Sequence, residues 1–135
     1  MRKSGWRGYV FSRAIAGQMI PQRVQNLVLR TYAEKSGIRY LLSATEYHMP
    51  GSHMMLESLY PEFRKLEGVL FYSLNMLPET KAGRRALYAA LKKNGCGLRF
   101  ALEELSASTA AEQRELEDIF VCRRLSAKPP LEILS

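Results

Sequence analysis

Val69-Leu70-Phe71-Tyr72 is the most continuous apolar stretch of the chain with the composition of a β-strand. Its large side chains follow one another without polar alternation. A strand with one face in water alternates apolar and polar residues, so a continuous run is typical of a central strand that is covered on both faces. The stretch therefore predicts a parallel sheet with helices on both sides.

Three other short segments predict the remaining strands. They cover residues 6–11, 40–43 and 97–101, and each is rich in β-branched, aromatic or aliphatic side chains. The segments between them have the apolar spacing of amphipathic helices. We expect these helices over residues 21–36, around residues 56–66, from residue 80 to Gly95, and over residues 110–121.

Individual residues orient and end these helices. In the first helix, Val24, Leu27, Val28 and Tyr32 recur at three- and four-residue spacing, which predicts that they form its buried face. Pro21 suits the first turn of that helix and Gly37 ends it. Pro61 is expected to kink the second helix or to mark the start of its last part.

The alternation of strands and helices indicates a single α/β domain over residues 1–135. Crossover connections of helical length make its four-stranded sheet open and mostly parallel, with flanking helices and the strand order 2-1-3-4. The core is expected within residues 6–104. A C-terminal helix and tail cover residues 105–135, where Lys128-Pro129-Pro130 ends regular structure.

Composition excludes several classes of protein. The chain has 135 residues, of which 47% are hydrophobic and 24% charged, as expected of one globular domain. No segment approaches the ~18 apolar residues of a membrane span, and the basic N-terminus lacks the apolar region of a signal peptide. We therefore expect a cytoplasmic protein. Cys96 and Cys122 lack metal-ligand spacing, so we expect free thiols, no metal and no cofactor.

The net charge of +7 comes from 20 basic and 13 acidic residues. It is compatible with nucleic acid, phosphorylated ligands or an anionic surface as partner. The basic residues are scattered in pairs, with no run of five or more. This scatter favours a solvated, mildly basic surface over a dedicated anion-binding face.

The order of elements and the contents of their loops resemble the catalytic domain of the serine recombinases, the resolvase and invertase family. The resemblance covers about residues 6–104. It implies a resolvase-like fold, with Ser12 as the candidate nucleophile. It is carried by Gly8-Tyr9-Val10-Phe11-Ser12-Arg13, by Gln25-Asn26-Leu27-Val28-Leu29-Arg30, by Glu46 with Gly51-Ser52, and by Tyr72-Ser73-Leu74-Asn75-Met76-Leu77-Pro78-Glu79.

The departures from that family fall on its chemistry. Serine recombinases attack a DNA phosphodiester with a serine, and several arginines hold the charge of the transition state. Met76 and Glu79 stand where the resemblance places two of these arginines. Arg13 follows Ser12, whereas the family has an arginine before its serine. The sequence therefore predicts that the chain is not an active recombinase, and it argues against nucleic acid as a partner.

The whole chain also resembles the sporadic carbohydrate cluster proteins, small bacterial proteins encoded within gene clusters for surface polysaccharide. That resemblance implies a protein that acts on or binds a sugar or sugar-nucleotide intermediate, and it carries over no catalytic residue. Whether the chain is an enzyme, with acid/base or transfer chemistry on a carbohydrate precursor, stays open. The residues involved are Gly8-Tyr9-Val10-Phe11-Ser12-Arg13, Pro21-Gln22-Arg23-Val24-Gln25-Asn26, Phe71-Tyr72-Ser73-Leu74 with Leu77-Pro78, and Leu98-Arg99-Phe100-Ala101-Leu102-Glu103-Glu104.

Two other functions are compatible with the sequence. One is an accessory scaffold for another enzyme of such a cluster, and the other is a recombinase-like DNA-binding protein that uses the positive charge. A homo-oligomer is compatible with all three functions.

The candidate site follows from the expected topology. In an open α/β sheet, ligands bind outside the carboxyl ends of the strands where the strand order reverses, here between strands one and three. We expect Ser12, Arg13, Glu46, Tyr72, Ser73 and Asn75 to line one pocket there. The candidate catalytic residues are Ser12, Glu46 and His48, and the candidate ligand-binding residues are Arg13, Gln18, Tyr72, Ser73 and Asn75.

These residue types have both functional and structural explanations. The planar guanidinium of Arg13 suits a phosphate or carboxylate, and Glu46 and His48 could move protons. Ser12 is a weak nucleophile without an activating base. Each also has a structural explanation. Ser12 could cap backbone groups, His48 could be a surface-loop histidine, and Tyr72 could be a core tyrosine with a satisfied hydroxyl. Glu103 and Glu104, after the fourth strand, could hold a general base or could simply favour a helix start.

Overall fold

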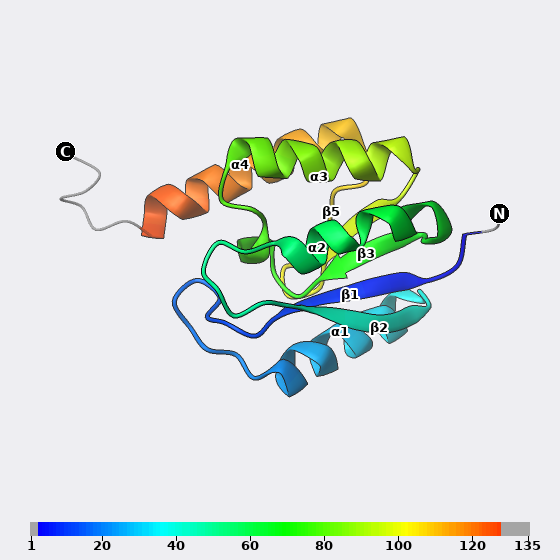
Figure 1. The fold of residues 1–135 in the computed structure, drawn as a ribbon, viewed down its shortest axis with the longest axis horizontal. Coiled ribbons are helices and arrows are strands. Elements are labelled where there is room, and N and C mark those ends of the chain that lie inside the picture. Colours follow the sequence, from blue (N-terminus) through cyan, green and yellow to red (C-terminus); the bar gives the residue numbers. More distant parts are fainter. Residues whose placement is uncertain (1–2, 128–135) are drawn as a thin grey trace.

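The computed structural model describes residues 3–127, and it contains a five-stranded sheet in the order β2-β1-β3-β4-β5 (Figure 1). The strands are β1 (Trp6–Phe11), β2 (Tyr40–Glu46), β3 (Gly68–Phe71), β4 (Gly97–Phe100) and β5 (Leu105–Ser106). The first four pair in parallel and β5 pairs antiparallel to β4. The predicted four-stranded order is confirmed, and β5 adds a short edge strand that we did not expect.

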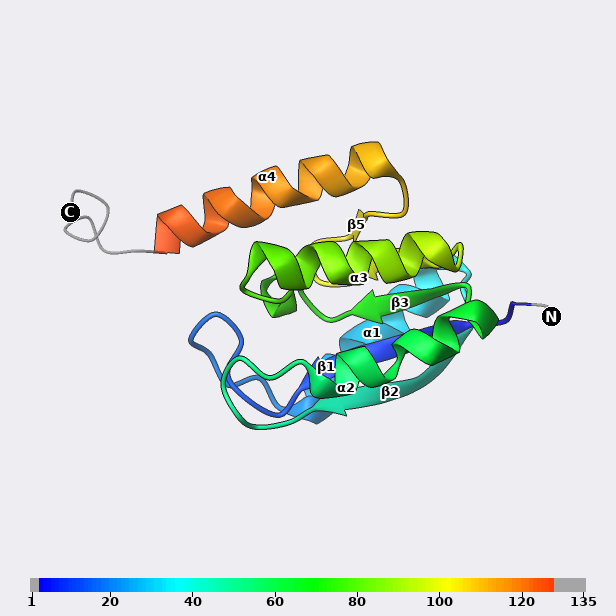
Figure 2. The same cartoon turned by 45° about the horizontal axis from the view of Figure 1, so that its top comes forward.

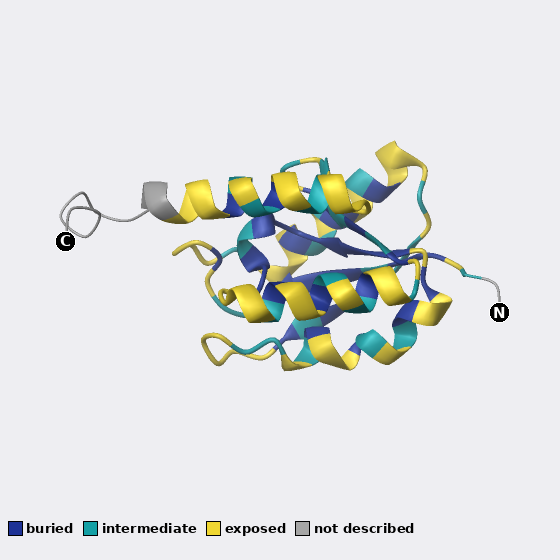
Figure 3. Ribbon diagram, turned by 90° about the horizontal axis from the view of Figure 1, so that it is seen from above, coloured by how far each residue is buried: buried dark blue, intermediate teal, exposed yellow. Residues whose placement is uncertain are grey.

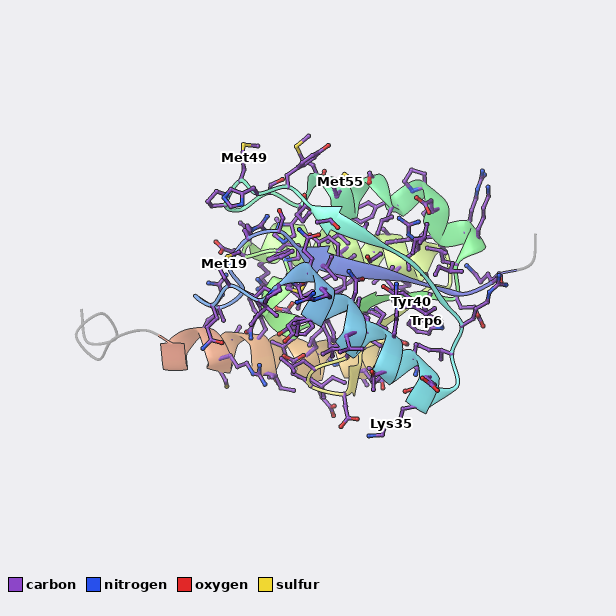
Figure 4. The ribbon with its side chains drawn as sticks, turned by 90° about the horizontal axis from the view of Figure 1, so that it is seen from below. Trp6, Met19, Lys35, Tyr40, Met49 and Met55 are labelled. Carbon is purple, nitrogen blue, oxygen red and sulfur yellow. The ribbon has the colours of Figure 1, made fainter. Side chains whose placement is uncertain are left out.

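Helices cover both faces of this sheet (Figures 1 and 2). Helix α1 (Gln22–Ser36) packs on one face, against β1 and β2, and lies in front of these strands in Figure 4. The other face carries α2 (Met54–Ser58), the 3-10 helix η1 (Tyr60–Lys65) and α3 (Lys81–Lys93). A second 3-10 helix, η2 (Leu74–Met76), follows β3 directly.

Helix α4 (Ala110–Ala127) runs alongside α3, and its C-terminal half extends toward the end of the molecule where the loops after β1 and β2 lie (Figure 2). An ion pair joins the two helices, with 2.8 Å between Nε of Arg84 and a carboxylate oxygen of Glu117. Leu116 and Phe120 pack α4 onto the body and are almost fully buried. The expected end of this helix at residue 121 is therefore too early, and the predicted stop at residues 128–130 lies outside the described residues.

The core confirms the central position of β3. All four of its residues are buried, and Val69, Leu70 and Phe71 have no exposed surface. The central strands β1 and β3 are mostly buried, and the outer faces of the helices are exposed (Figure 3). Strand β2 is mostly of intermediate burial. The apolar stretch that predicted a sheet covered on both faces is the middle of the molecule.

The buried face of α1 is shifted from the predicted one, because Val28 and Tyr32 pack partly buried against the core but Val24 and Leu27 do not. Leu27 is 63% exposed and Val24 is 40% exposed, whereas Gln25, Leu29 and Ala33 are buried. The buried amide of Gln25 explains the difference, because it hydrogen-bonds both backbone groups of Phe11, at 2.9 Å each. A polar side chain that saturates backbone groups in this way is stable in a core.

One further boundary differs from the prediction, and the position of Pro61 agrees with one of its two predicted roles, the start of the last part of the second helix. Strand β2 extends through Glu46, so the loop expected at residue 45 begins later. The second helix is broken into α2 and η1, with Pro61 in the first turn of η1. Proline cannot continue a helix because it lacks an amide hydrogen, but its fixed φ suits a helix start.

Candidate functional site

A cavity of about 280 Å³ opens at the carboxyl ends of β1 and β3. The strand order reverses at this position, because β2 lies on one side of β1 and β3 on the other. Figure 2 shows that the loops after these strands and the C-terminal part of α4 lie at the same end of the molecule. The lining residues are Phe11, Arg13, Ala14, Ala16, Gly17, His53, Asn75, Leu77, Glu79, Arg123 and Arg124.

Three arginines give this cavity its charge. Arg13 comes from the loop after β1, and Arg123 and Arg124 come from α4, more than one hundred positions later in the chain. Among the described lining residues Glu79 is the only carboxylate, and it pairs with Arg124 at 3.3 Å. The walls therefore carry an excess of positive charge, which suits an anionic ligand.

Contacts with the body hold two of these basic side chains in place. The Arg13 guanidinium lies 4.0 Å from the centre of the Phe11 ring, and its Nη1 donates a hydrogen bond of 2.9 Å to the carbonyl of Tyr47. Arg123 lies 3.3 Å from a carboxylate oxygen of Glu103. Stacking and a single hydrogen bond leave most of the five guanidinium N–H donors of Arg13 free for a ligand.

His53 and Asn75 complete the polar lining of the cavity. His53 Nε2 lies 3.0 Å from the carbonyl oxygen of Met76, and its Nδ1 lies 3.3 Å from the carbonyl oxygen of Gly51. Asn75 follows β3 within η2, where its backbone N–H donates to the hydroxyl of Ser73 at 3.2 Å. Asn75 lines the cavity, and no described hydrogen bond engages its side-chain amide.

Glu46, predicted as a catalytic residue, is 1% exposed and its carboxylate is occupied by hydrogen bonds. The Tyr9 hydroxyl donates to it at 2.8 Å, and the backbone N–H groups of Met55 and Leu56 donate at 3.1 Å. Further donors are the Tyr47 amide at 2.9 Å and the Ser52 hydroxyl at 3.3 Å. The carboxylate thereby joins β1, β2 and the first turn of α2.

These contacts also set the ionisation of Glu46 and Tyr9. Burial by itself raises the pKa of Glu46, but the hydrogen bonds from Tyr47, Met55, Tyr9 and Leu56 outweigh it, and the pKa lies below its ordinary value. Burial and the neighbouring Glu46 carboxylate raise the pKa of Tyr9 far above its usual range. Tyr9 therefore stays protonated and Glu46 stays ionised at neutral pH.

The His48 ring contacts the backbone carbonyl of Ser12, while the Ser12 hydroxyl contacts a different residue. The Ser12 hydroxyl donates to the carbonyl of Glu46 at 2.8 Å, and His48 Nδ1 lies 3.2 Å from the carbonyl of Ser12. No described hydrogen bond joins the His48 ring to the Ser12 hydroxyl. The arrangement does not provide the base that would activate a serine.

The other predicted residues separate from the cavity. Buried Ser73 donates to Glu103 at 2.7 Å, and the backbone of Tyr72 bonds Tyr9 and Leu102. Gln18 is exposed on a turn, where its backbone pairs with Ile15. Of the six residues expected to line one pocket, only Arg13 and Asn75 line this cavity.

Sequence reasoning missed the contribution of α4. The pair Arg123-Arg124 is visible as one of several basic pairs, but nothing local indicates that it reaches the strand ends. His53, which precedes the first residue of α2, is also missing from the predicted site. In the described part of the chain, no three histidine, cysteine or acidic side chains are grouped to hold a metal ion, and no helix is long and apolar enough to cross a membrane.

Comparison with solved structures defines the class of fold. The N-terminal catalytic domain of TP901-1 integrase is similar, with a TM-score of 0.62 and 18% identity over 89% of this chain and 95% of that one. A resolvase family site-specific recombinase from Streptococcus pneumoniae matches with a TM-score of 0.62 and 11% identity over 88% of each chain. The chain therefore has the fold of resolvase-type catalytic domains.

No protein-family model and no curated protein matches the sequence. The resemblance to serine recombinases is confirmed at the level of the fold. The resemblance to the carbohydrate cluster proteins gains no support from these comparisons.

Proposed function

We propose that this protein binds a phosphorylated small molecule in the arginine-lined cavity, and that this ligand is a sugar or sugar-nucleotide intermediate of surface-carbohydrate assembly. The main observation in support is that Arg13, Arg123 and Arg124 line one cavity at the carboxyl ends of β1 and β3. The earlier resemblance to carbohydrate cluster proteins suggests the carbohydrate part of the ligand.

The chemistry of the walls favours a phosphate over a neutral group. Arginine offers paired N–H donors that match two oxygens of one phosphate, and hydrogen bonds to an ionised group are stronger than neutral ones. Glu103 and Glu79 contact Arg123 and Arg124 in the free protein. These carboxylates hold the arginine side chains in position until an anion binds.

Binding, rather than covalent chemistry, is the function that this geometry supports best. The Ser12 hydroxyl is engaged as a donor to a backbone carbonyl, and the Glu46 carboxylate is filled by donors of its own fold. A ligand in the cavity contacts the three arginines and Asn75, and these side chains bind and orient it. Catalytic roles for Ser12, Glu46 and His48 stay predictions.

Calorimetric titration tests the proposal directly. Inorganic phosphate and a nucleoside diphosphate sugar should bind the wild-type protein, and Arg13→Ala or Arg123→Ala should each weaken binding about tenfold through loss of a charged hydrogen bond. Arg30→Ala is the matched control, because Arg30 is exposed on α1 and lines no described part of this cavity. Binding that is unchanged by both cavity variants would overturn the proposal.

The similarity in fold to recombinases suggests DNA cleavage as an activity, but the residues of this chain argue against it. Met76 is completely buried and Glu79 pairs with Arg124, so neither position supplies a cation for a phosphodiester. We expect supercoiled plasmid to stay intact and Ser12 to form no covalent adduct with DNA. A Ser12–DNA adduct would restore the recombinase interpretation.

A further inference from the structure

A second cavity, of about 360 Å³, adjoins the arginine-lined one. His53 and Glu79 line both cavities, so these two residues form their common wall. The second cavity lies between α2, η1 and the first turns of α3, and the residues that it adds include Glu57, Tyr60 and Thr80. A ligand that reaches past His53 and Glu79 enters it.

The two cavities have opposite electrostatic character. No described lysine or arginine lines the second cavity, whereas Glu57 and Glu79 both do. Glu79 is paired with Arg124, but no described ion pair or hydrogen bond engages the carboxylate of Glu57. Glu57 is thus a free negative charge that faces a space bounded on its far side by cations.

Tyr60 adds an aromatic wall beside Glu57. Its ring packs against the buried Phe63 ring, with 5.3 Å between centroids, so it is held in place. Burial and the nearby Glu57 raise the pKa of Tyr60 to about 12, and the phenol stays neutral. A carboxylate next to an aromatic ring is a combination that attracts ammonium groups.

Size indicates that one ligand uses both cavities. Pockets that hold metabolites or drug-sized molecules enclose about 300–1,000 Å³. The arginine-lined cavity lies just below this range and the second cavity at its lower end. Together they match a ligand larger than a bare phosphate.

From these features we infer that the ligand is a phosphate ester with a positively charged amino group, whose phosphate lies among Arg13, Arg123 and Arg124 and whose ammonium lies against Glu57. This inference rests on the proposed function. It adds that the organic part of the ligand is cationic rather than neutral.

The test compares glucosamine 6-phosphate with glucose 6-phosphate, which differ in one ammonium in place of one hydroxyl. At slightly acidic pH, where the amine is protonated, wild-type protein should bind the amino sugar about fivefold more tightly, the gain expected of a partly exposed ion pair. Glu57→Gln should remove this preference and leave the affinity for glucose 6-phosphate unchanged. Glu34→Gln, an exposed α1 variant of equal charge change, should keep the preference.

The outcomes separate the two proposals. Equal affinity for the two sugar phosphates, or a preference that survives Glu57→Gln, would overturn the ammonium site while phosphate binding stands. Failure of inorganic phosphate to bind, or binding that neither Arg13→Ala nor Arg123→Ala weakens, would overturn the proposed function and the ammonium site with it.

Discussion

Glu46 and Glu103 lie near the carboxyl ends of β2 and β4, the two strands that flank the central pair β1 and β3, and their hydrogen-bond partners differ. Glu46 is the last residue of β2 and Glu103 lies shortly after β4. Each accepts a hydrogen bond from a backbone N–H of a helix that begins nearby. The Glu46 carboxylate accepts hydrogen bonds from Tyr9 of β1, from Tyr47 just after β2 and from Met55 of α2. Glu103 binds Ser73 and the Leu74 amide, and it also contacts Arg123 of the cavity.

The difference separates a structural carboxylate from one connected to the site. A carboxylate whose oxygens are saturated by the fold has no capacity left for a ligand or a proton transfer. Glu103 shares one oxygen with an arginine that lines the cavity, so a ligand there changes its surroundings. Two carboxylates at similar positions therefore have separable contributions, one to stability and one to binding.

The largest effect should come from Glu46→Ala. This change leaves the buried Tyr9 hydroxyl and the amides of Met55 and Leu56 without their acceptor, and unsatisfied buried donors are costly. We expect the free energy of unfolding in urea to fall by about 3–5 kcal/mol. Glu34→Ala on the exposed face of α1 should change it little, and a small effect of Glu46→Ala would show that the carboxylate is not a structural anchor.

Glu103→Ala should destabilise the protein less. It removes the acceptor of the Ser73 hydroxyl and of the Leu74 amide, and the third partner of Glu103, Arg123, is partly exposed. The expected loss in the same urea experiment is about 1–3 kcal/mol. A loss equal to that of Glu46→Ala would remove the distinction between the two carboxylates.

Acid should expose the Glu46 contribution. Because the folded pKa of Glu46 lies below its ordinary value of 4.5, the stabilisation is fully present above about that pH and is lost as the pH falls through the lower, folded value. Glu46→Gln should therefore flatten the stability profile below pH 4.5. Part of the slope should persist, because the hydrogen bond from Arg84 lowers the pKa of Glu117 against the effect of burial. An unchanged acid profile would contradict the pKa shift of Glu46.

The smallest effect should appear in anion affinity. Glu103→Gln keeps an acceptor for Ser73 but removes a negative charge beside Arg123, so phosphate should bind about twofold to threefold more tightly. Glu46→Gln should leave phosphate affinity unchanged, because its charge is buried among other donors. Titration of both variants by calorimetry checks this contrast, and a reversed order would contradict the assignment.

The strand order could be predicted because each strand has a local signal and parallel crossovers restrict the topology. The buried face of α1 could not be predicted from apolar periodicity, because one of its buried residues is polar. Gln25 is buried there since its side-chain amide hydrogen-bonds the backbone of Phe11. The resemblance to serine recombinases pointed to Gln25 and Leu29, and both are buried. A motif that includes a buried polar residue carries information that apolar spacing lacks.

The candidate site was predictable in position but only partly in composition. The switch point between strands one and three follows from topology, and Arg13 and Asn75 follow from their strands. Arg123 and Arg124 depend on where α4 packs, which is decided by the Arg84–Glu117 pair and by Phe120 beneath the Arg84 guanidinium. Contacts of this kind between distant segments leave no local pattern.

Mapping of a phosphate titration onto backbone amide signals by NMR tests the central claim most directly. Phosphate should shift the amides of Ala14, Gly17 and Asn75, which surround the arginine-lined cavity. The amides of Met55 and Leu56, which are bonded to Glu46, should stay in place. Shifts confined to Met55 and Leu56, or no shift at all, would contradict the assignment of this cavity as the anion site.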